Sequence, residues 1–358
     1  MLLIHSCVYN TQNNKGILCL SDDCLTDSIV FKHKNNKSLV WLRPNETTFE
    51  LLLESKLYSY NDKFKTLDSI KQKFTDGTDD VFKIGNDYFY DRRTSPRNLV
   101  KEFKDSLSFY TLPTTVYNYD KKNYSLQLYS NNSFVRLPNN EFIAPILYRS
   151  DSDASTITDY LKNCNQNRLG HFWINNNQIK IKRLINFFPR ADFFIGDKRF
   201  NNIQLTICQN SQNYFIALNS LDTIFEYGFD GKLIKQIPLP KELKYQYYYN
   251  ETNIVNTQSR NLSEISGSRN FKLYYNFYEN QLILITFEGL NPNKKYEIIP
   301  KFEEFDWLAS VYDLNKEKWI KIIKFNKEHD IRNVMFQNRN ILVKRAKSEQ
   351  LIFDKYAY

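Results

Sequence analysis

The hydrophobic and polar positions of residues 213–240 alternate in a way that predicts three short β-strands in succession. Apolar residues recur at every second position through most of NYFIALNSLDTIFEYGFDGKLIKQIPLP. Asp230 and Gly231 supply the turn chemistry of a two-residue hairpin between the second and third strands. Pro238 and Pro240 end the third strand because proline has no backbone donor. The segment therefore predicts an antiparallel meander.

The same pattern recurs along the chain as an aromatic pair at positions i and i+2, an Asn or Asp turn, and a returning strand. The pairs begin at residues 31, 58, 117, 225 and 312. Two further copies are expected near 170–184 and 273–289. Units of 40 to 55 residues made of short strands are typical of a β-propeller. The fold class predicted is therefore an all-β β-propeller, with six blades preferred and seven as the other count; a pair of β-sandwiches is the alternative.

The last copy of the pattern contains too few strands for a blade. We therefore expect the N-terminal segment around KGILCLS or SIVFKH to complete it, which makes residues 8–358 a single propeller domain. Few short helices are expected. Residues 155–167 have a helical pattern, 241–249 are ambiguous, and 94–107 fit a helix or a decorated loop.

Charge is spread along the chain and does not indicate nucleic-acid binding. The 49 Lys and Arg residues exceed the 40 Asp and Glu residues, which gives a net charge of +9. Nucleic-acid binders concentrate their cations on one helix or stripe, whereas here acids lie among them. The densest basic stretch, residues 177–185, reads as a strand with one solvated face. No apolar run is long enough to predict a transmembrane helix.

The N-terminal residues MLLIHSC resemble the end of a bacterial lipoprotein signal. Ile4 and Ser6 fit that pattern before Cys7, while His5 does not. Residues 1–7 are therefore expected to be the remnant of a signal that ends at a lipidated Cys7. The other interpretation is an N-terminal strand with a free thiol. Lipidation implies the periplasm or outer membrane, and the alternative is the cytoplasm.

The repeated pattern and the start together resemble a known family. DTIFEYGFDGKLIKQIPLP (222–240), VYDLNKEKWIKIIKF (311–325) and the IHSC start are similar to the six-bladed β-propeller proteins of Bacteroidota. Many of these proteins are lipoproteins of uncharacterised activity. The resemblance covers most of the chain and implies the fold and an envelope location. It implies no catalytic residue.

Motifs for catalysis and for cofactors are absent from the sequence. There is no Gly-rich phosphate loop, no nucleophile elbow and no zinc-binding helix. No cofactor is predicted except Ca²⁺ as a candidate, since Asp76, Asp79 and Asp80 offer closely spaced carboxylates. Asp-rich turns are also common for backbone reasons alone. No metal site is therefore predicted beyond this candidate, and no catalytic residue is assigned.

Aromatic segments are the better candidates for binding. Tyrosine offers a flat apolar surface with a polar tip, and arginine can receive an anionic group. The segments concerned are read as loops, at residues 86–97 and 244–253. The candidate ligand-binding residues are Tyr88, Tyr90, Arg92, Arg93, Tyr247 and Tyr248. The competing interpretation places these tyrosines in blade cores.

The function expected from the sequence is a non-enzymatic binding or scaffold propeller at the cell envelope. Its partner is expected to be a protein or a glycan, the membrane is reached only through a lipid anchor, and the chain is expected to be a monomer. The alternative is a propeller enzyme, such as a lactonase, lyase or glycan hydrolase, with a site in the central channel. Fold alone does not decide between these functions.

Overall fold

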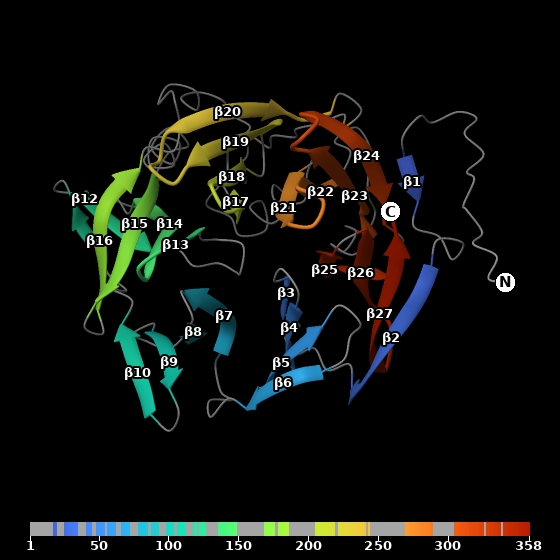
Figure 1. Cartoon of the computed structure of the whole chain (residues 1–358), viewed down its shortest axis with the longest axis horizontal. Coiled ribbons are helices and arrows are strands. Elements are labelled where there is room, and N and C mark those ends of the chain that lie inside the picture. Colours follow the sequence, from blue (N-terminus) through green and yellow to red (C-terminus); the bar gives the residue numbers. More distant parts are fainter. Residues whose placement is uncertain are drawn as a thin grey trace, which may run out of the picture. The chain divides into compact units, whose positions relative to one another are not determined.

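The computed structural model describes the strands of the chain and the tight turns that join some of them. The residues described are 17–19, 25–34, 41–44, 48–53, 56–61, 66–71, 78–84, 87–92, 98–103, 106–111, 117–119, 122–126, 135–148, 168–175, 178–185, 205–218, 221–240, 243, 269–288, 304–325, 327–337 and 339–358. Within these residues the regular structure is almost entirely β-strand, arranged in six sheets (Figure 1). The chain is a β-propeller.

The first of two compact units contains residues 1–71, 274–289 and 294–358. One sheet has the order β3 (Trp41–Pro44), β4 (Thr48–Leu53), β5 (Lys56–Asn61), β6 (Thr66–Lys71). A second has the order β25 (His329–Gln337), β26 (Asn340–Arg345), β27 (Gln350–Ala357), β2 (Leu25–Lys34). The third runs β21 (Arg269–Asn276), β22 (Gln281–Glu288), β23 (Asp306–Asp313), β24 (Lys318–Lys324), β1 (Ile17–Cys19). Residues 269–273 of β21 belong to the second unit.

The second unit contains residues 72–273 and 290–293. One sheet has the order β7 (Thr78–Ile84), β8 (Asp87–Arg92), β9 (Asn98–Phe103), β10 (Ser106–Thr111). Another has the order β17 (Leu205–Gln209), β18 (Asn213–Leu218), β19 (Thr223–Gly228), β20 (Leu233–Pro238). The third runs β11 (Tyr117–Tyr119), β12 (Lys122–Leu126), β14 (Glu141–Tyr148), β15 (Arg168–Asn175), β16 (Gln178–Ile185), and β13 (Val135–Leu137) also pairs with β14.

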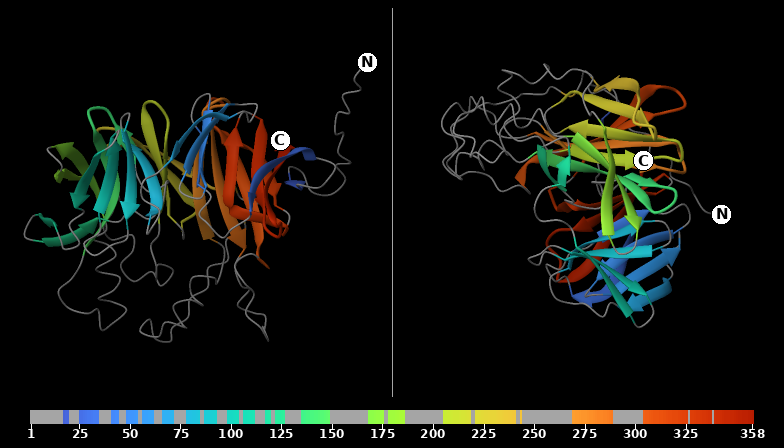
Figure 2. Two further views of the ribbon diagram at one scale, coloured as in Figure 1. Left: turned by 90° about the horizontal axis from the view of Figure 1, so that it is seen from below. Right: turned by 90° about the vertical axis from the view of Figure 1, so that its left-hand side faces the viewer.

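The N-terminal segment completes the last sheet, as the sequence predicts. β2 pairs antiparallel with β27, for example Ser28 with Asp354 and Phe31 with Leu351. Figures 1 and 2 show the blue strand beside the red C-terminal strands. β1 pairs in parallel with β24, so the N-terminal segment adds an outer strand to two sheets of this unit.

The repeated sequence pattern marks the third strand of its sheet in three copies. The pairs that begin at 58, 225 and 312 lie in β5, β19 and β23, and each is followed by the fourth strand. The expected copy at 170–184 is the β15–β16 hairpin, which forms the last two strands of its sheet. A bulge or irregularity of register occurs in all four of these hairpins. The pattern therefore indicates a bulged hairpin at the outer side of a sheet.

Three copies of the pattern occupy other positions in their sheets. The pair at 31 lies in β2, and the next strand, β3, belongs to another sheet. The pair at 117 lies in β11, an edge strand before the core of its sheet. Residues 273–289 form the first and second strands of their sheet, not the third and fourth. An aromatic pair before Asn is compatible with any strand that ends in a turn, so position within a sheet does not follow from it.

Two local predictions also need correction. The β19–β20 connection is longer than a two-residue hairpin, because the Gly228 amide donates to the Lys232 carbonyl at 3.0 Å and the Gly231 amide to the Gly228 carbonyl at 2.8 Å. Gly231 takes φ +83°, as the residue after a type I turn requires. Residues 98–103 and 106–111 form β9 and β10 instead of a helix or loop. Residues 155–167 lie outside the described part.

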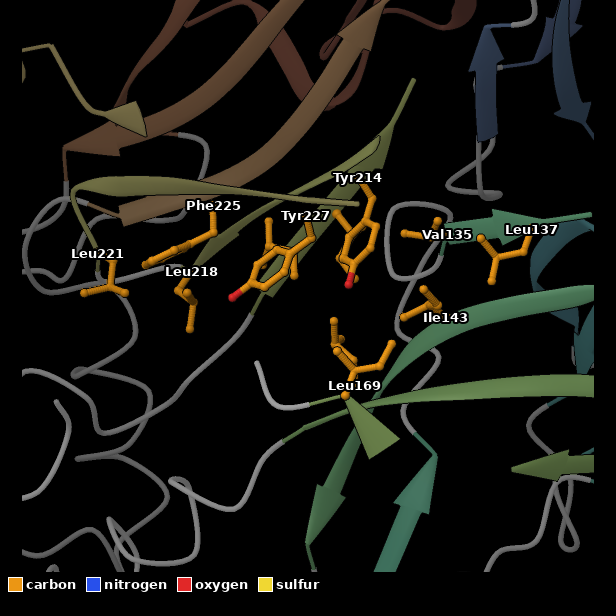
Figure 3. Close-up of a cluster of buried hydrophobic side chains, with 12 residues drawn as sticks. Val135, Leu137, Ile143, Leu169, Tyr214, Leu218, Leu221, Phe225 and Tyr227 are labelled. Atoms are coloured by element: carbon orange, nitrogen blue, oxygen red, sulfur yellow. The ribbon is translucent and has the colours of Figure 1, made fainter. Parts of the chain in front are cut away.

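Aliphatic and aromatic side chains form the core of the second unit (Figure 3). The cluster draws on β13 to β19 and consists of Val135, Leu137, Ile143, Leu169, Ile185, Ile207, Tyr214, Ile216, Leu218, Leu221, Phe225 and Tyr227. The side-chain amide of Gln209 on β17 donates to the Arg136 carbonyl on β13 at 3.1 Å, which links two sheets of this unit. Cys208, also on β17, is a free thiol whose pKa is raised by desolvation.

Tyr214 is fully buried in this cluster and stacks on Tyr227 with ring centroids 5.4 Å apart. Its hydroxyl is buried and has no hydrogen-bond partner among the described residues. Desolvation by the surrounding side chains raises the pKa of this phenol. An unsatisfied buried polar group costs about 1–3 kcal/mol.

We expect Tyr214→Phe to raise the free energy of unfolding by about 1 kcal/mol, because it removes that hydroxyl and keeps the ring. Tyr274→Phe is the matched control, since the Tyr274 hydroxyl donates to the Val334 carbonyl at 2.9 Å. It should lower the same free energy by about 1 kcal/mol. Urea denaturation of both variants measures the difference. Equal destabilisation by the two changes would show that the Tyr214 hydroxyl is satisfied.

Candidate functional site

The tyrosines and arginines predicted to bind a ligand divide between a strand and the undescribed part of the chain. Tyr88, Tyr90 and Arg92 lie in β8, a central strand between β7 and β9, and not in a loop. Arg93, Tyr247 and Tyr248 lie outside the described residues. The structure therefore corrects the loop assignment at residues 87–92, and the binding role of these residues stays a prediction.

The calcium and lipidation candidates are divided in the same way. Asp79 and Asp80 lie in β7, where the register shifts between Thr78 and Asp80, while Asp76 and Cys7 lie outside the described residues. Among the residues that the structure describes, no three His, Cys, Asp or Glu side chains are grouped as a metal site. A search of those residues also finds no helix able to span a membrane.

A carboxylate and a histidine meet on the β14–β16 sheet. His171 on β15 is 6% exposed, and its Nε2 lies 2.6 Å from Glu141 Oε2 on β14. Lys182 Nζ donates to Glu141 Oε1 at 2.8 Å, and Arg183 Nε donates to His171 Nδ1 at 3.4 Å. Because Nδ1 accepts from Arg183, Nε2 carries the proton and donates to Glu141. Both imidazole nitrogens are engaged, so the group fastens three strands together.

The protonation of this group follows from its surroundings. Burial lowers the pKa of His171, even though Glu141 favours the charged imidazole. The hydrogen bond from Lys182 lowers the pKa of Glu141. At neutral pH the pair is therefore a neutral imidazole that donates to an ionised carboxylate.

We expect His171 to make the protein less stable as the pH falls below about 6.5, the ordinary pKa of histidine. The unfolded chain binds a proton there before the folded chain does, so acid favours unfolding. His171→Gln keeps an N–H donor for Glu141 but does not titrate. Denaturation at pH 5 to 7.5 should show a flatter stability profile for the variant, in a range above the carboxylate titrations. Parallel profiles for the variant and the wild type would contradict this assignment.

The turn between β21 and β22 presents two aromatic side chains to solvent. Phe277 is 49% exposed and the adjacent Tyr278 is 40% exposed. Their ring centroids are 6.2 Å apart and the ring planes meet at 81°. The other large hydrophobic side chains exposed in the described part are Val30, Ile234 and Ile320, which are aliphatic. Val30 and Ile234 lie on the outermost strands β2 and β20, and Ile320 lies on β24. We call residues 277–280 the aromatic turn.

Two asparagines hold the aromatic turn at its ends. Asn276 is buried, and its Oδ1 accepts the Tyr278 amide at 3.2 Å while its Nδ2 donates to the Tyr358 hydroxyl at 2.8 Å. Asn280 adopts φ +50°, a left-handed conformation that asparagine tolerates. Its Oδ1 accepts the Tyr275 hydroxyl at 3.1 Å. The backbone path of the turn is therefore fixed by side chains.

Neighbouring turns support the aromatic turn from outside. The Asn280 carbonyl accepts the Leu314 amide at 3.1 Å, and Asn280 Nδ2 donates to Asn315 Oδ1 at 2.6 Å. On another side, Arg339 Nε donates to Glu279 Oε1 at 3.2 Å. These contacts join the aromatic turn to the β23–β24 turn and to Arg339 before β26.

The sequence analysis did not identify the aromatic turn as a site. Residues 273–289 continue the apolar alternation, and that pattern does not distinguish Phe277 and Tyr278 from core residues. The available signal was the spacing of Asn276 and Asn280 around the aromatic pair. Asparagine at both ends of a four-residue segment favours a side-chain-capped turn, whose tip points to solvent.

Comparisons with known proteins support the fold but do not indicate a function. No protein-family model and no curated protein matches the chain. A member of the DUF4221 family from Bacteroides vulgatus has a TM-score of 0.63 at 10% identity, over 93% of this chain and 98% of that chain. A streptogramin B lyase matches with a TM-score of 0.40 at 9% identity, over 94% and 99% of the two chains. Regucalcin from Agrobacterium tumefaciens, a calcium-binding protein, gives 0.41 at 9% identity over 95% of each chain.

The likeness to the Bacteroides protein shows a shared fold, since that alignment spans nearly both chains. Ten per cent identity is too low to transfer an activity. The lyase and the calcium-binding protein have lower scores and carry no argument about this chain. Function must therefore be argued from the residues of the chain.

Proposed function

We propose that the chain is a six-bladed, non-enzymatic binding propeller that acts at the cell envelope. The aromatic turn carries this proposal. Two adjacent aromatic side chains are held half exposed by buried and charged neighbours, although burying them would be favourable by about 1.5–3 kcal/mol each. We infer that this adjacent pair of exposed aromatic side chains is a contact surface for a partner, as contiguous exposed apolar patches often are.

The Glu141–His171 pair does not supply a competing active site. A general base needs a nitrogen that can take a proton from a substrate, whereas both nitrogens of His171 already have partners. The pair also lies across the hairpins of one sheet, where it fixes their register. The non-enzymatic function is therefore the one that the described residues support best.

Photocrosslinking in cells that produce the protein tests the binding function. p-Benzoylphenylalanine replaces Tyr278 in one variant and Ile234 in a control variant, because both side chains are exposed. We expect a discrete adduct from position 278 and none from position 234. The same adduct from both positions, or none from either, would contradict the proposal.

A thermal-melt screen separates the proposal from a propeller enzyme with a metal in its channel. A ligand that binds only the folded chain raises its stability. We expect the unfolding midpoint to be unchanged by Ca²⁺ and by EDTA. A rise with Ca²⁺ that EDTA reverses would favour the enzyme and would direct attention to the acidic segment at residues 75–80.

The envelope location rests on the lipoprotein-like residues before Cys7. A chain anchored there would be a lipidated monomer in the periplasm or at the outer membrane. We expect the intact mass of the membrane-bound protein to include acyl chains, and Cys7→Ser to abolish both the added mass and membrane retention. An unmodified Cys7 in the membrane fraction would overturn the anchor and leave the binding function to be judged separately.

A further inference from the structure

We propose that Phe277 and Tyr278 are anchor residues for a protein partner that presents an apolar pocket with an acidic rim. The inference rests on the proposed binding function and identifies the partner class. It depends on the shape of the aromatic turn, its rigidity and the charges around it.

The aromatic turn ends a hairpin, and its two adjacent aromatic side chains are exposed (49% and 40%). Small molecules are bound in concave sites that bury most of their surface. A protruding aromatic side chain instead enters a pocket of its partner, as the anchor residues of protein interfaces do. The geometry therefore favours a protein over a free small ligand.

The rigidity of the aromatic turn also favours a role as an anchor for a protein partner, because it reduces the free-energy cost of binding. Binding normally costs free energy for each side chain that becomes ordered. Here Asn276 and Asn280 already fix the turn, and the two rings pack edge to face. Much of the ordering cost is thus met before a partner arrives, so two rings are enough to act as anchors.

The charges beside the aromatic turn are presented unequally to solvent. The Arg339 side chain is 76% exposed while its partner Glu279 is 24% exposed. Lys316 is 64% exposed while its partner Asp313 is 7% exposed. The cations therefore face solvent, and their acids lie beneath them. Glu317 and Lys318 at the β23–β24 hairpin are also exposed and have opposite charges. The named acids and bases are equal in number, but three of the exposed groups are cations and one is a carboxylate. The solvent-facing rim, which consists of Lys316, Glu317, Lys318 and Arg339, is therefore positive.

The positive rim around the two aromatic side chains indicates which surface the partner should have. The partner should carry Asp or Glu around a pocket wide enough for one aromatic ring, because electrostatic complementarity steers association and excludes wrong partners. Arg339 uses one of its five N–H donors on Glu279 and keeps others for a carboxylate. The predicted interface is therefore apolar at its centre and charged at its edge.

Selection from a naive peptide library displayed on phage tests this inference with the full chain as the target. We expect the selected peptides to be enriched in apolar and acidic residues. Their affinities should fall at least tenfold for the double variant Phe277→Ala, Tyr278→Ala. For the control double variant Val30→Ala, Ile234→Ala, the affinities should change less than twofold. The matched control removes two exposed aliphatic side chains elsewhere. Peptides that bind both double variants equally would overturn the inference.

Two further experiments test whether the aromatic turn binds a carbohydrate or a second copy of the chain instead of another protein. Calorimetry with defined oligosaccharides would reveal a carbohydrate site if binding is lost in the Phe277→Ala, Tyr278→Ala variant; this overturns the protein partner and leaves the binding function intact. Sedimentation would reveal a second copy of the chain if self-association is lost in the same variant, and that would overturn a distinct partner. We expect neither result.

Salt dependence tests the rim separately. Association of a selected peptide should slow as salt is raised, because exposed charges are screened over about 10 Å at 0.1 M salt. Lys316→Ala with Arg339→Ala should remove most of that dependence while Phe277 and Tyr278 still bind. An unchanged dependence on salt would contradict the acidic rim.

Discussion

Phe31→Ala is expected to lower the free energy of unfolding by about 3–5 kcal/mol, the cost of truncating a buried aromatic side chain. Phe31 is 8% exposed on β2 and packs edge to face on Tyr60 at 5.4 Å and on Phe353 at 5.8 Å. Those rings come from different sheets of one unit, so the N-terminal strand supplies the residue that joins them. The loss should be measured by urea denaturation.

Because Phe31 lies on an outermost strand, its loss should also increase local opening of β2, in addition to lowering the global free energy of unfolding. β2 is an outermost strand held only by β27 in its sheet, so it can open before the rest of the chain unfolds. Hydrogen exchange of residues 25–34 should therefore accelerate more in the variant than exchange of β26. Val30→Ala is the control on the same strand, because Val30 is 53% exposed and its loss should cost less than about 0.5 kcal/mol. Equal costs for the two variants would show that β2 does not close the sheet through Phe31.

The sequence allowed the strand content and the closure to be predicted because both depend on local alternation. Residues 213–240 alternate clearly and form β18, β19 and β20. The last copy of the pattern contains too few strands for a blade, which made an N-terminal strand the expected complement. β2 fills that place through its pairing with β27.

Position within a sheet could not be predicted in the same way. The pair at Phe31 has the same local pattern as the pair at Phe225, yet β2 is an outermost strand and β19 a third strand. What separates them is the identity of the neighbouring strand, which comes from residues more than 300 positions away in the case of β2. Local pattern holds no information about such a partner.

The candidate site was missed for a related reason. Phe277 and Tyr278 continue an apolar run, and hydrophobicity alone assigns them to the core. Their exposure is set by Asn276 and Asn280, which end one strand and begin the next. Two side-chain hydrogen bonds thus outweigh the hydrophobic pattern at this point.

Asp354→Ala is expected to lower the free energy of unfolding by about 2–3 kcal/mol. The Asp354 side chain is 5% exposed and accepts hydrogen bonds from Arg345 Nη2 at 2.6 Å, Arg345 Nε at 3.0 Å and Ser28 Oγ at 2.7 Å. Breaking a buried pair costs about 3–5 kcal/mol, and the lower value here reflects Arg345, which is 38% exposed and can turn to water. Urea denaturation measures the loss.

Asp306→Ala is the matched control for this variant. Asp306 also binds one basic residue, Lys324 at 2.9 Å, but its side chain is 36% exposed and that of Lys324 is 42% exposed. A pair in contact with water contributes about 0–1 kcal/mol. Similar costs for Asp354→Ala and Asp306→Ala would show that burial adds nothing to the Asp354 network.

The double variant decides whether Phe31 and Asp354 hold the same strand. Phe31 packs against one face of the sheet, while Ser28 binds Asp354 from the same strand, so the two side chains fasten β2 independently in the folded chain. If Phe31→Ala already releases β2, the bond from Ser28 is lost before Asp354 is changed. Asp354→Ala should then cost less in that background than in the wild type, by about 0.5 kcal/mol or more, the scale at which neighbouring sites couple. Strict additivity would mean that β2 stays paired without Phe31, and that the polar network alone is sufficient to keep the N-terminal strand in place.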